Sequence, residues 1–230
     1  MLSIKAVTFD YFGTLVDCDA GGASGARKLL SMLDRRDIDP VALYADWDRR
    51  TVQTYRGSSY RRYRDIATES LAAALEAAAP GITKRADVAA AAETLLSGLV
   101  ECARPFSEVV EIVDKLAGRY PLMPITNMDS DLFARSQLAS RFPHATTAEM
   151  ARAYKPSERI FRLALDRLAV APEDVLHVSL SPWADIDGAK PLGMRVAWIN
   201  RTGESLGPWS PKPDWEFPDM NGLRPLLDLH

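Results

Sequence analysis

Cysteine is scarce in this chain, which has two among its 230 residues, Cys18 and Cys102. They stand far apart in the sequence and match no metal-ligand spacing. We therefore expect neither cysteine to bind a metal or to take part in catalysis.

Neither sign of charge is in large excess. The 28 basic and 31 acidic side chains give a net charge of −3, so we expect no nucleic-acid partner. No apolar run approaches the roughly 18 residues that a membrane-spanning helix requires, so no membrane partner is expected either. The first residues predict a strand rather than a signal peptide, and we expect the protein to be cytoplasmic.

Several common catalytic motifs are also absent. Gly21, Gly22 and Gly25 fit neither G-x-G-x-x-G nor G-x-x-x-x-G-K-[ST], so we predict a flexible connection from Cys18 to Ser24 rather than a phosphate-binding loop. The chain has no G-x-S-x-G motif and no histidine cluster with metal-ligand spacing. His177, at the end of a predicted strand, is accordingly interpreted as a hydrogen-bonded structural residue.

A short apolar run close to the N-terminus ends abruptly in a carboxylate. Ile4 to Phe9 predicts a buried strand, and Asp10 follows it just before the glycine turn at Gly13. Asp10 could simply cap this turn. In an open α/β sheet, however, ligands bind at the carboxyl ends of the strands, which would place Asp10 at the mouth of a site.

The remaining sequence divides into a helical stretch and an alternating stretch. From Ala26 to about Ala103 the hydrophobic periodicity predicts only helices. We interpret them as a helical lobe inserted after the first strand. Beyond Pro105, helices and strands alternate, which predicts a parallel sheet with helices on both faces. The predicted strands are Leu122 to Thr126, Val175 to Ser179 and Val196 to Ile199, and the predicted helices are Val109 to Leu116, Asp129 to Leu138, Ile160 to Leu168 and Ile186 to Leu192, with a surface loop from Pro208 to Pro218 before a last helical turn at Leu223 to Leu229.

Three further polar stretches follow predicted strands or lie in the loops beyond them: Thr126-Asn127, Lys155-Pro156, and Asp185-x-x-Gly188-Ala189-Lys190-x-x-Gly193. Together with Asp10-x-x-Gly13-Thr14-Leu15, they resemble in order and spacing the motifs of the haloacid dehalogenase superfamily. The resemblance implies an α/β fold with a Rossmann-like parallel sheet core formed by residues 1–17 and 104–230. Residues 18–103 would form an inserted all-helical cap.

The resemblance also implies a role for each motif residue. Asp10 would be the nucleophile, forming a covalent aspartyl intermediate that water then opens. Thr126 or Asn127 would hydrogen-bond the charge that develops on the substrate or on Asp10. Thr14 would orient Asp10.

The two remaining motif residues carry charge. Lys155 would keep Asp10 ionised, because a nearby ammonium lowers the pKa of a carboxyl group. Asp185 would pair with Lys155, position water or contact a metal.

Two departures argue against phosphate monoester hydrolysis. Phosphatases of this superfamily carry a general-acid aspartate at the position of Phe12, which can donate no proton. They also carry a Gly-Asp pair in the fourth motif that helps to bind Mg²⁺, where this chain has Ser179-Leu180-Ser181. A magnesium ion, if bound, would have to use Asp10 and Asp185.

The sequence is instead similar to the 2-haloacid dehalogenase branch. An aromatic residue in Asp10-Tyr11-Phe12-Gly13 and the fourth motif with Ser179, Ser181 and Trp183 both resemble that branch. A halide leaving group needs no proton, and displacement at carbon needs no metal. Tyr11, Phe12, Ser179, Ser181 and Trp183 are candidate substrate-binding residues, although a core or interface role for Trp183 remains open.

The match to this branch is incomplete. Its cap arginine lies beside a tryptophan and takes up the substrate carboxylate and the halide, whereas here Trp47 precedes Asp48, with Arg49 and Arg50 next. Arg49 is the candidate for carboxylate binding and Arg50 the alternative. Phe161 and Ser181 replace a tyrosine and an asparagine expected from the branch.

Three hypotheses follow. The first is a metal-independent hydrolase of the dehalogenase type, without a cofactor, acting on a small-molecule carboxylate. The second is a Mg²⁺-dependent phosphatase or phosphonatase-like enzyme on the same fold, and the third is a catalytically inactive binding protein. A homodimer is compatible with each.

Overall fold

The computed structural model describes residues 3–57, 59–84 and 86–229. The chain folds into two compact units. The α/β unit contains residues 3–16, 105–127 and 140–229, and the helical unit contains Asp17–Arg104 and Met128–Ala139. Residues 1, 2, 58, 85 and 230, which the predicted ranges include, lie outside the described residues.

The α/β unit is built on a six-stranded sheet with the strand order β3-β2-β1-β4-β5-β6. The strands are β1 (Ala6–Phe9), β2 (Leu122–Thr126), β3 (Thr146–Thr147), β4 (Val175–Ser179), β5 (Arg195–Ile199) and β6 (Trp215–Phe217). All neighbouring strands pair in parallel. This arrangement confirms the expected fold class, and it surrounds β1 with strands that follow it much later in the sequence.

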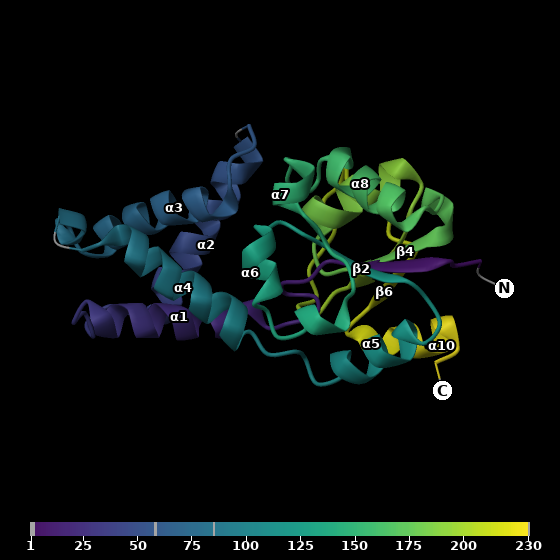
Figure 1. Cartoon of the computed structure of the whole chain (residues 1–230), viewed down its shortest axis with the longest axis horizontal. Helices are drawn as coiled ribbons and strands as arrows, with labels where there is room; N and C mark the ends of the chain where they lie inside the picture. The colour runs from purple at the N-terminus through teal and green to yellow at the C-terminus, as the bar shows by residue number, and fades with distance from the viewer. Residues whose placement is uncertain (1–2, 58, 85, 230) are drawn as a thin grey trace. The chain divides into compact units, whose positions relative to one another are not determined.

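Helices cover both faces of this sheet. They are α5 (Val109–Ala117), α7 (Ala148–Ala151), α8 (Glu158–Leu168), α9 (Asp187–Ala189) and α10 (Leu223–Leu227). Helices α5 and α10 lie on one side of the sheet and α8 lies on the other (Figure 1). Helix α8 buries an apolar face that includes Ile160, Phe161 and Leu165, as its helical periodicity predicts.

Parallel register brings the strand ends to one edge. Phe9 lies opposite Pro124 of β2 on one side and opposite Val178 of β4 on the other. Asp10 continues the pairing beyond the strand, since its N–H donates to the Val178 carbonyl at 3.0 Å. The residues that follow β1, β2 and β4 are therefore neighbours at the carboxyl edge of the sheet.

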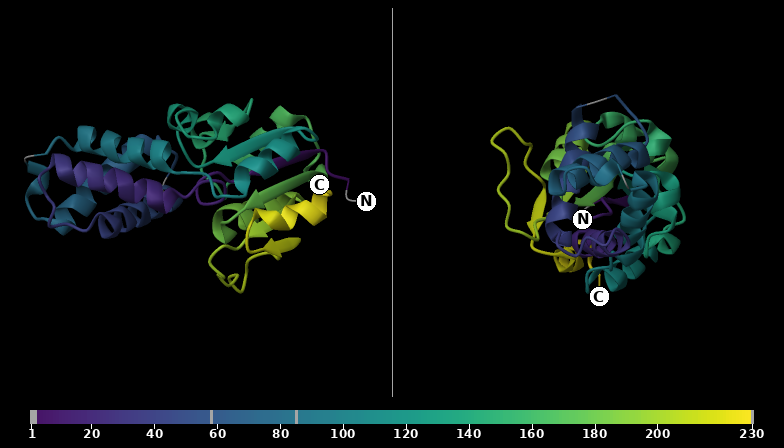
Figure 2. Two further views of the ribbon diagram at one scale, coloured as in Figure 1. Left: turned by 90° about the horizontal axis from the view of Figure 1, so that it is seen from below. Right: turned by 90° about the vertical axis from the view of Figure 1, so that its left-hand side faces the viewer.

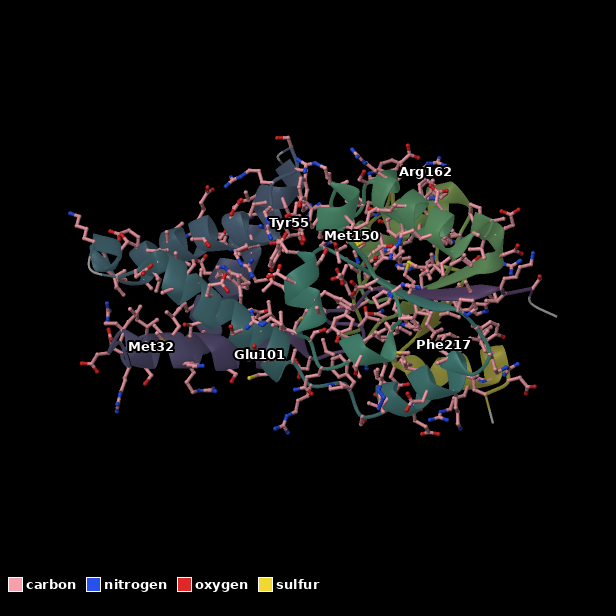
Figure 3. All side chains as sticks on the ribbon, viewed as in Figure 1. Met32, Tyr55, Glu101, Met150, Arg162 and Phe217 are labelled. Carbon is pink, nitrogen blue, oxygen red and sulfur yellow. The ribbon has the colours of Figure 1, made fainter. Side chains whose placement is uncertain are left out.

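The helical unit consists of α1 (Cys18–Met32), α2 (Pro40–Gly57), α3 (Tyr63–Ala78), α4 (Val88–Cys102) and α6 (Ser130–Ala134). Met32 and Glu101, labelled in Figure 3, mark the C-terminal parts of α1 and α4. Asp17 caps α1 by accepting from the Ala20 N–H, and Asp87 caps α4 by accepting from the Ala90 N–H. Among the described residues, none of the helices has the length and apolar character that crossing a membrane requires.

The prediction of a flexible connection from Cys18 to Ser24 is wrong, because these residues form the first half of α1. Their glycines allow close helix packing. A Cβ added at Gly98 of α4 would lie 2.2 Å from the Gly25 Cα, and one added at Gly21 would lie 2.8 Å from the Leu99 carbonyl oxygen. The small residues that suggested a loop are thus the contact surface between α1 and α4.

Residues 128–139, which the sequence placed in the core range 104–230, belong to the helical unit. Asp129 accepts hydrogen bonds from the backbone N–H groups of Tyr63 and Arg64 at 3.0 Å each, at the start of α3. Arg135 pairs with Glu101 of α4. The helix here covers only Ser130–Ala134, half the length predicted.

The C-terminal segment, yellow in Figure 2, also differs from its prediction as a surface loop. Residues Trp215–Phe217 form the edge strand β6, and Asn200 donates its N–H to the Phe217 carbonyl at 2.7 Å. The strand was not predicted because it is short and the proline and aspartate residues around it are typical of a loop.

Candidate active site

Asp10 lies at the carboxyl end of the central strand and is almost entirely buried, with 7% of its surface exposed. The Thr14 hydroxyl donates to Asp10 Oδ2 at 2.6 Å and accepts from the Leu180 N–H at 2.8 Å. Because Leu180 already supplies a proton to the Thr14 oxygen, the hydroxyl proton is directed to Asp10. Gly13 makes the turn between them with a φ of 85°.

Lys155 joins two carboxylates. Its Nζ donates to Asp10 Oδ1 at 2.7 Å and to Asp185 Oδ1 at 2.8 Å, and its own side chain is only 2% exposed. The residue lies between α7 and α8, directly before Pro156, with a cis peptide bond between the two. Asp10 lies 145 positions before Lys155 in the sequence and Asp185 lies 30 positions after it, yet the three residues form one buried cluster.

Asn127 positions Lys155 through its backbone. Its Oδ1 accepts from the Lys155 N–H at 2.7 Å, and its Nδ2 donates to the Lys155 carbonyl at 3.4 Å. Asn127 therefore shapes the loop that carries Lys155, and its role in stabilising charge on the substrate or on Asp10 stays a prediction. Thr126, the alternative residue, is buried at the end of β2.

Asp185 is fully buried in a π-helical turn, Pro182–Ile186, which continues into α9. Its Oδ1 accepts from Lys155 and also lies 2.9 Å from Nε2 of His177. His177 lies on β4, two residues before Ser179. His177 Nδ1 lies 2.9 Å from the Thr8 hydroxyl of β1. His177 is thus hydrogen-bonded, as predicted from the sequence, and it is fully buried.

Burial and neighbouring charges shift the pKa values of this cluster. Burial raises the pKa of Asp10, and although Lys155 and Thr14 oppose this shift, the net direction is upward. The expected lowering by Lys155 is therefore present but is outweighed by burial. For Asp185, burial also acts upward, yet Lys155 and His177 hold its pKa at about 2. Burial lowers the pKa of Lys155, but the two carboxylates outweigh it and raise the value.

The two serines of the fourth motif hold their own loop. The Ser179 hydroxyl accepts from the Ser181 N–H at 3.0 Å, and the Ser181 hydroxyl accepts from the Ala184 N–H at 3.3 Å. The second contact caps the π-helical turn that carries Asp185. Trp183, in the same turn, is partly exposed.

Tyr11 and Phe12 follow Asp10 directly. Tyr11 is fully buried and its ring lies edge-on to Phe12, with 4.9 Å between the centroids, whereas Phe12 is partly exposed. Arg49 belongs to α2 of the helical unit, where Arg49 and Arg50 both pair with Asp46. These contacts leave the role of Arg49 in substrate binding a prediction.

Arg201 is a supporting residue that the sequence did not single out for the site. It donates to the Thr14 carbonyl at 2.9 Å and to Glu108 at 2.7 Å, and its guanidinium lies 3.8 Å from the centroid of the Phe106 ring. It thereby anchors the loop after Asp10. Its position directly after β5 and Asn200 gives no pattern that would have revealed these contacts.

The parallel sheet and the carboxylate–ammonium–carboxylate cluster at its carboxyl edge define an α/β protein of the class that places its reactive groups where the strands end. A family model for haloacid dehalogenase-like hydrolases matches residues 4–193. The chain belongs to this family of hydrolases.

Individual relatives point to one branch of the family. Haloacetate dehalogenase H-2 of Moraxella sp. (strain B) is 32% identical over 129 residues, which are 54% of this chain and 57% of that protein. An (S)-2-haloacid dehalogenase of Pseudomonas sp. (strain YL) is 27% identical over 240 residues, covering 98% of this chain and 94% of the relative. The crystal structure of a 2-haloacid dehalogenase from Pseudomonas syringae pv. Tomato DC3000 is 28% identical, with a TM-score of 0.73 and 98% coverage of both chains.

Proposed function

We propose that this hydrolase acts on a small carboxylate that bears a halide or another good leaving group on the adjacent carbon, with Asp10 as nucleophile and without a metal. The observation that carries the proposal is the buried Asp10–Lys155–Asp185 cluster, in which an ammonium lies between the two carboxylates. The position of Phe12, which holds no proton donor, agrees with a leaving group that departs as an anion.

In the first step, a carboxylate oxygen of Asp10 attacks the carbon that bears the leaving group. The new C–O bond forms as the carbon–halogen bond breaks, and the halide leaves with the bonding electron pair. Thr14 and Lys155 each bind one oxygen of Asp10, so the carboxylate is oriented before the substrate arrives. A single displacement at this carbon inverts its configuration.

In the second step, water attacks the carboxyl carbon of the aspartyl ester. Asp185 takes a proton from this water, and the bond between the Asp10 carboxyl carbon and the ester oxygen breaks as Asp185 passes that proton to the ester oxygen. The ester oxygen leaves as the hydroxyl group of the product, and the second proton of the water is released to solvent as Asp10 ionises. The products are the hydroxy acid and a regenerated Asp10 carboxylate. Lys155 stays within reach of the charge that develops on the ester oxygen.

The donor set at this site does not fit Mg²⁺, which prefers several hard oxygen ligands. Asp10 and Asp185 already share Lys155, and the neighbouring fourth-motif position is Leu180, which has no side-chain oxygen. Within the described part of the chain, no group of three or more His, Cys, Asp or Glu residues is arranged to hold a metal ion. We therefore derive no phosphatase step.

Substrate binding is proposed for Phe12 and Trp183 of the α/β unit and, separately, for Arg49 of the helical unit. Phe12 and Trp183 are partly exposed aromatic side chains and suit an apolar substrate chain. Arg49 suits the substrate carboxylate because its guanidinium can bind both oxygens.

The test measures halide release from small 2-haloacids and phosphate release from an aryl phosphate in parallel, with Mg²⁺ and with a chelator. The proposal predicts halide release that persists with chelator and is lost in Asp10→Asn. Phosphate release that occurs only with Mg²⁺ would overturn it. No release in either assay would favour a binding protein or a different leaving group.

A further inference from the structure

His177 is a fully buried ionisable side chain that neither step above uses. Both of its ring nitrogens have partners, Asp185 Oδ1 for Nε2 and the Thr8 hydroxyl for Nδ1. Because an ionised carboxylate only accepts hydrogen bonds, the proton on this contact belongs to Nε2. This holds for the neutral ring and for the imidazolium alike.

The orientation of the ring is fixed on several sides. Thr8 and His177 lie directly opposite each other in the parallel register of β1 and β4. The Phe161 ring packs edge-on against the imidazole, with 5.5 Å between centroids and an interplanar angle of 88°. Phe161 is itself held by Gly188, where an added Cβ would lie 2.3 Å from the phenylalanine ring.

These contacts make the two oxygens of Asp185 unequal. Oδ1 accepts from both Lys155 and His177, whereas Oδ2 is buried and has no hydrogen-bond partner among the described residues. A buried carboxylate oxygen without a donor is unfavourable. Of the two oxygens of Asp185, Oδ2 is therefore the one to which no described residue donates a hydrogen bond.

We propose that His177 is a positioning residue for the hydrolytic step: its Nε2–H holds Asp185 Oδ1, so that Oδ2 faces the attacking water and takes its proton. The inference rests on the proposed function, in which an ester on Asp10 must be opened. Displacement of the halide uses Asp10 directly and needs no base. Loss of His177 should consequently slow ester hydrolysis and leave ester formation nearly unchanged.

Two variants of similar length separate this role from packing. His177→Gln keeps an N–H donor close to the position of Nε2, and His177→Met fills a similar volume without a donor. Both remove the aromatic contact with Phe161 and the titratable ring. Any difference between the two variants in the hydrolytic step therefore reports the hydrogen bond to Asp185.

The experiment mixes each enzyme with a 2-haloacid that the wild type converts, and follows the halide burst, the steady-state rate and the mass of the Asp10 peptide after acid quench. In His177→Met we expect a full burst of about one halide per site, a steady state slowed about tenfold or more, and ester accumulation on Asp10. His177→Gln should recover most of the steady-state rate. Melting temperatures of both variants report whether they fold.

Three outcomes would contradict a positioning role for His177. Equal slowing of the burst and the steady state in both variants, or equal behaviour of Gln and Met, would overturn the positioning role and leave His177 as a packing residue. If His177→Met does not fold, slow ester hydrolysis in His177→Gln with a normal burst would overturn it equally. A wild type that forms no ester on Asp10 with any 2-substituted carboxylate, whether the leaving group is a halide or another anion, would instead overturn the proposed function, and this inference with it.

Discussion

Asp10 and Asp185 are the same type of residue, are both buried and are both bound to Lys155, yet their pKa values shift in opposite directions. Burial acts upward on both. Asp185 has two nitrogen donors, Lys155 and His177, whereas Asp10 has one ammonium and a neutral hydroxyl. The second nitrogen donor lowers the pKa of Asp185, and the negative charge of Asp185 in turn helps to raise the pKa of Asp10.

We predict that the two corresponding asparagine variants change stability with opposite signs at pH 7. Asp10→Asn should raise the melting temperature, because ionised Asp10 is disfavoured in the folded state. Asp185→Asn should lower the free energy of unfolding by about 2 kcal/mol, which corresponds to a pKa held near 2. Thermal and denaturant unfolding of the variants and the wild type measure both effects.

The pH dependence of these effects provides the control. A raised pKa in the folded state stabilises the protein at low pH, so the gain in Asp10→Asn should vanish below about pH 4, where both states bind the proton. A lowered pKa contributes stability above about pH 4, which is lost as the pH falls through about 2. Destabilisation by Asp10→Asn at neutral pH would contradict this account of the cluster.

Activity should depend on pH through the same Asp10 group. Only the ionised carboxylate attacks, so kcat/KM should fall on the acid side at a pH above the ordinary aspartate range, because burial raises the pKa of Asp10. Lys155→Met removes the charge that lowers the pKa of Asp10, so the acid-side fall in kcat/KM should move to a higher pH. A pH profile that is flat through the acid range, or a limb that moves downward in Lys155→Met, would contradict the prediction.

The contacts among these side chains were only partly predictable from the sequence. Motif spacing grouped Asp10, Lys155 and Asp185, and the structure brings them together. The pairing of Thr8 with His177 depends on which residues lie opposite each other in β1 and β4. The sequence contains no information on that register until the strands are paired.

At the scale of elements, the contact between α1 and α4 depends on glycine. Gly25 and Gly98 face each other so closely that neither position has space for a Cβ. A Cβ added at Gly25 would lie 2.5 Å from the Leu95 carbonyl oxygen. The helices can approach at this distance only because both residues lack a side chain. Glycine is unfavourable in the interior of a helix, and the close packing of α1 against α4 offsets this loss.

We therefore predict that Gly98→Ala destabilises the protein by about 1–3 kcal/mol, because the helices must move apart. Gly57, the last residue of α2, is the matched control, since an added Cβ there has no atom of the described residues within 4 Å. Gly57→Ala should be neutral or stabilise by up to about 1 kcal/mol. Denaturant unfolding compares them, and equal effects of the two substitutions would show that propensity, rather than packing, dominates.

Elements with strong periodicity were predictable and short ones were not. The predicted strand from Leu122 to Thr126 and the predicted helix ending at Leu168 agree closely with β2 and α8. Strands β3 and β6, of two and three residues, are too short for an alternating pattern to be visible. Their formation depends on pairing with an existing neighbouring strand.

In the whole molecule, four short motifs were sufficient to predict the fold and the family, because each lies at the carboxyl end of a strand of one sheet or in the segments that follow it. The substrate is less accessible from the sequence. Arg49, for which we propose binding of the substrate carboxylate, lies in the helical unit, where helical periodicity predicts which face is buried but not which side chain binds a ligand. Specificity therefore has to be measured.

In the proposed mechanism Asp10, not water, attacks the substrate carbon. The most direct measurement is a single turnover of a 2-haloacid in ¹⁸O-labelled water with enzyme in excess. Attack by Asp10 gives a hydroxy acid with an unlabelled hydroxyl oxygen and places ¹⁸O in the carboxyl group of Asp10, where mass spectrometry of the peptide detects it. Label in the hydroxyl group of the first-turnover product, with none in Asp10, would contradict it.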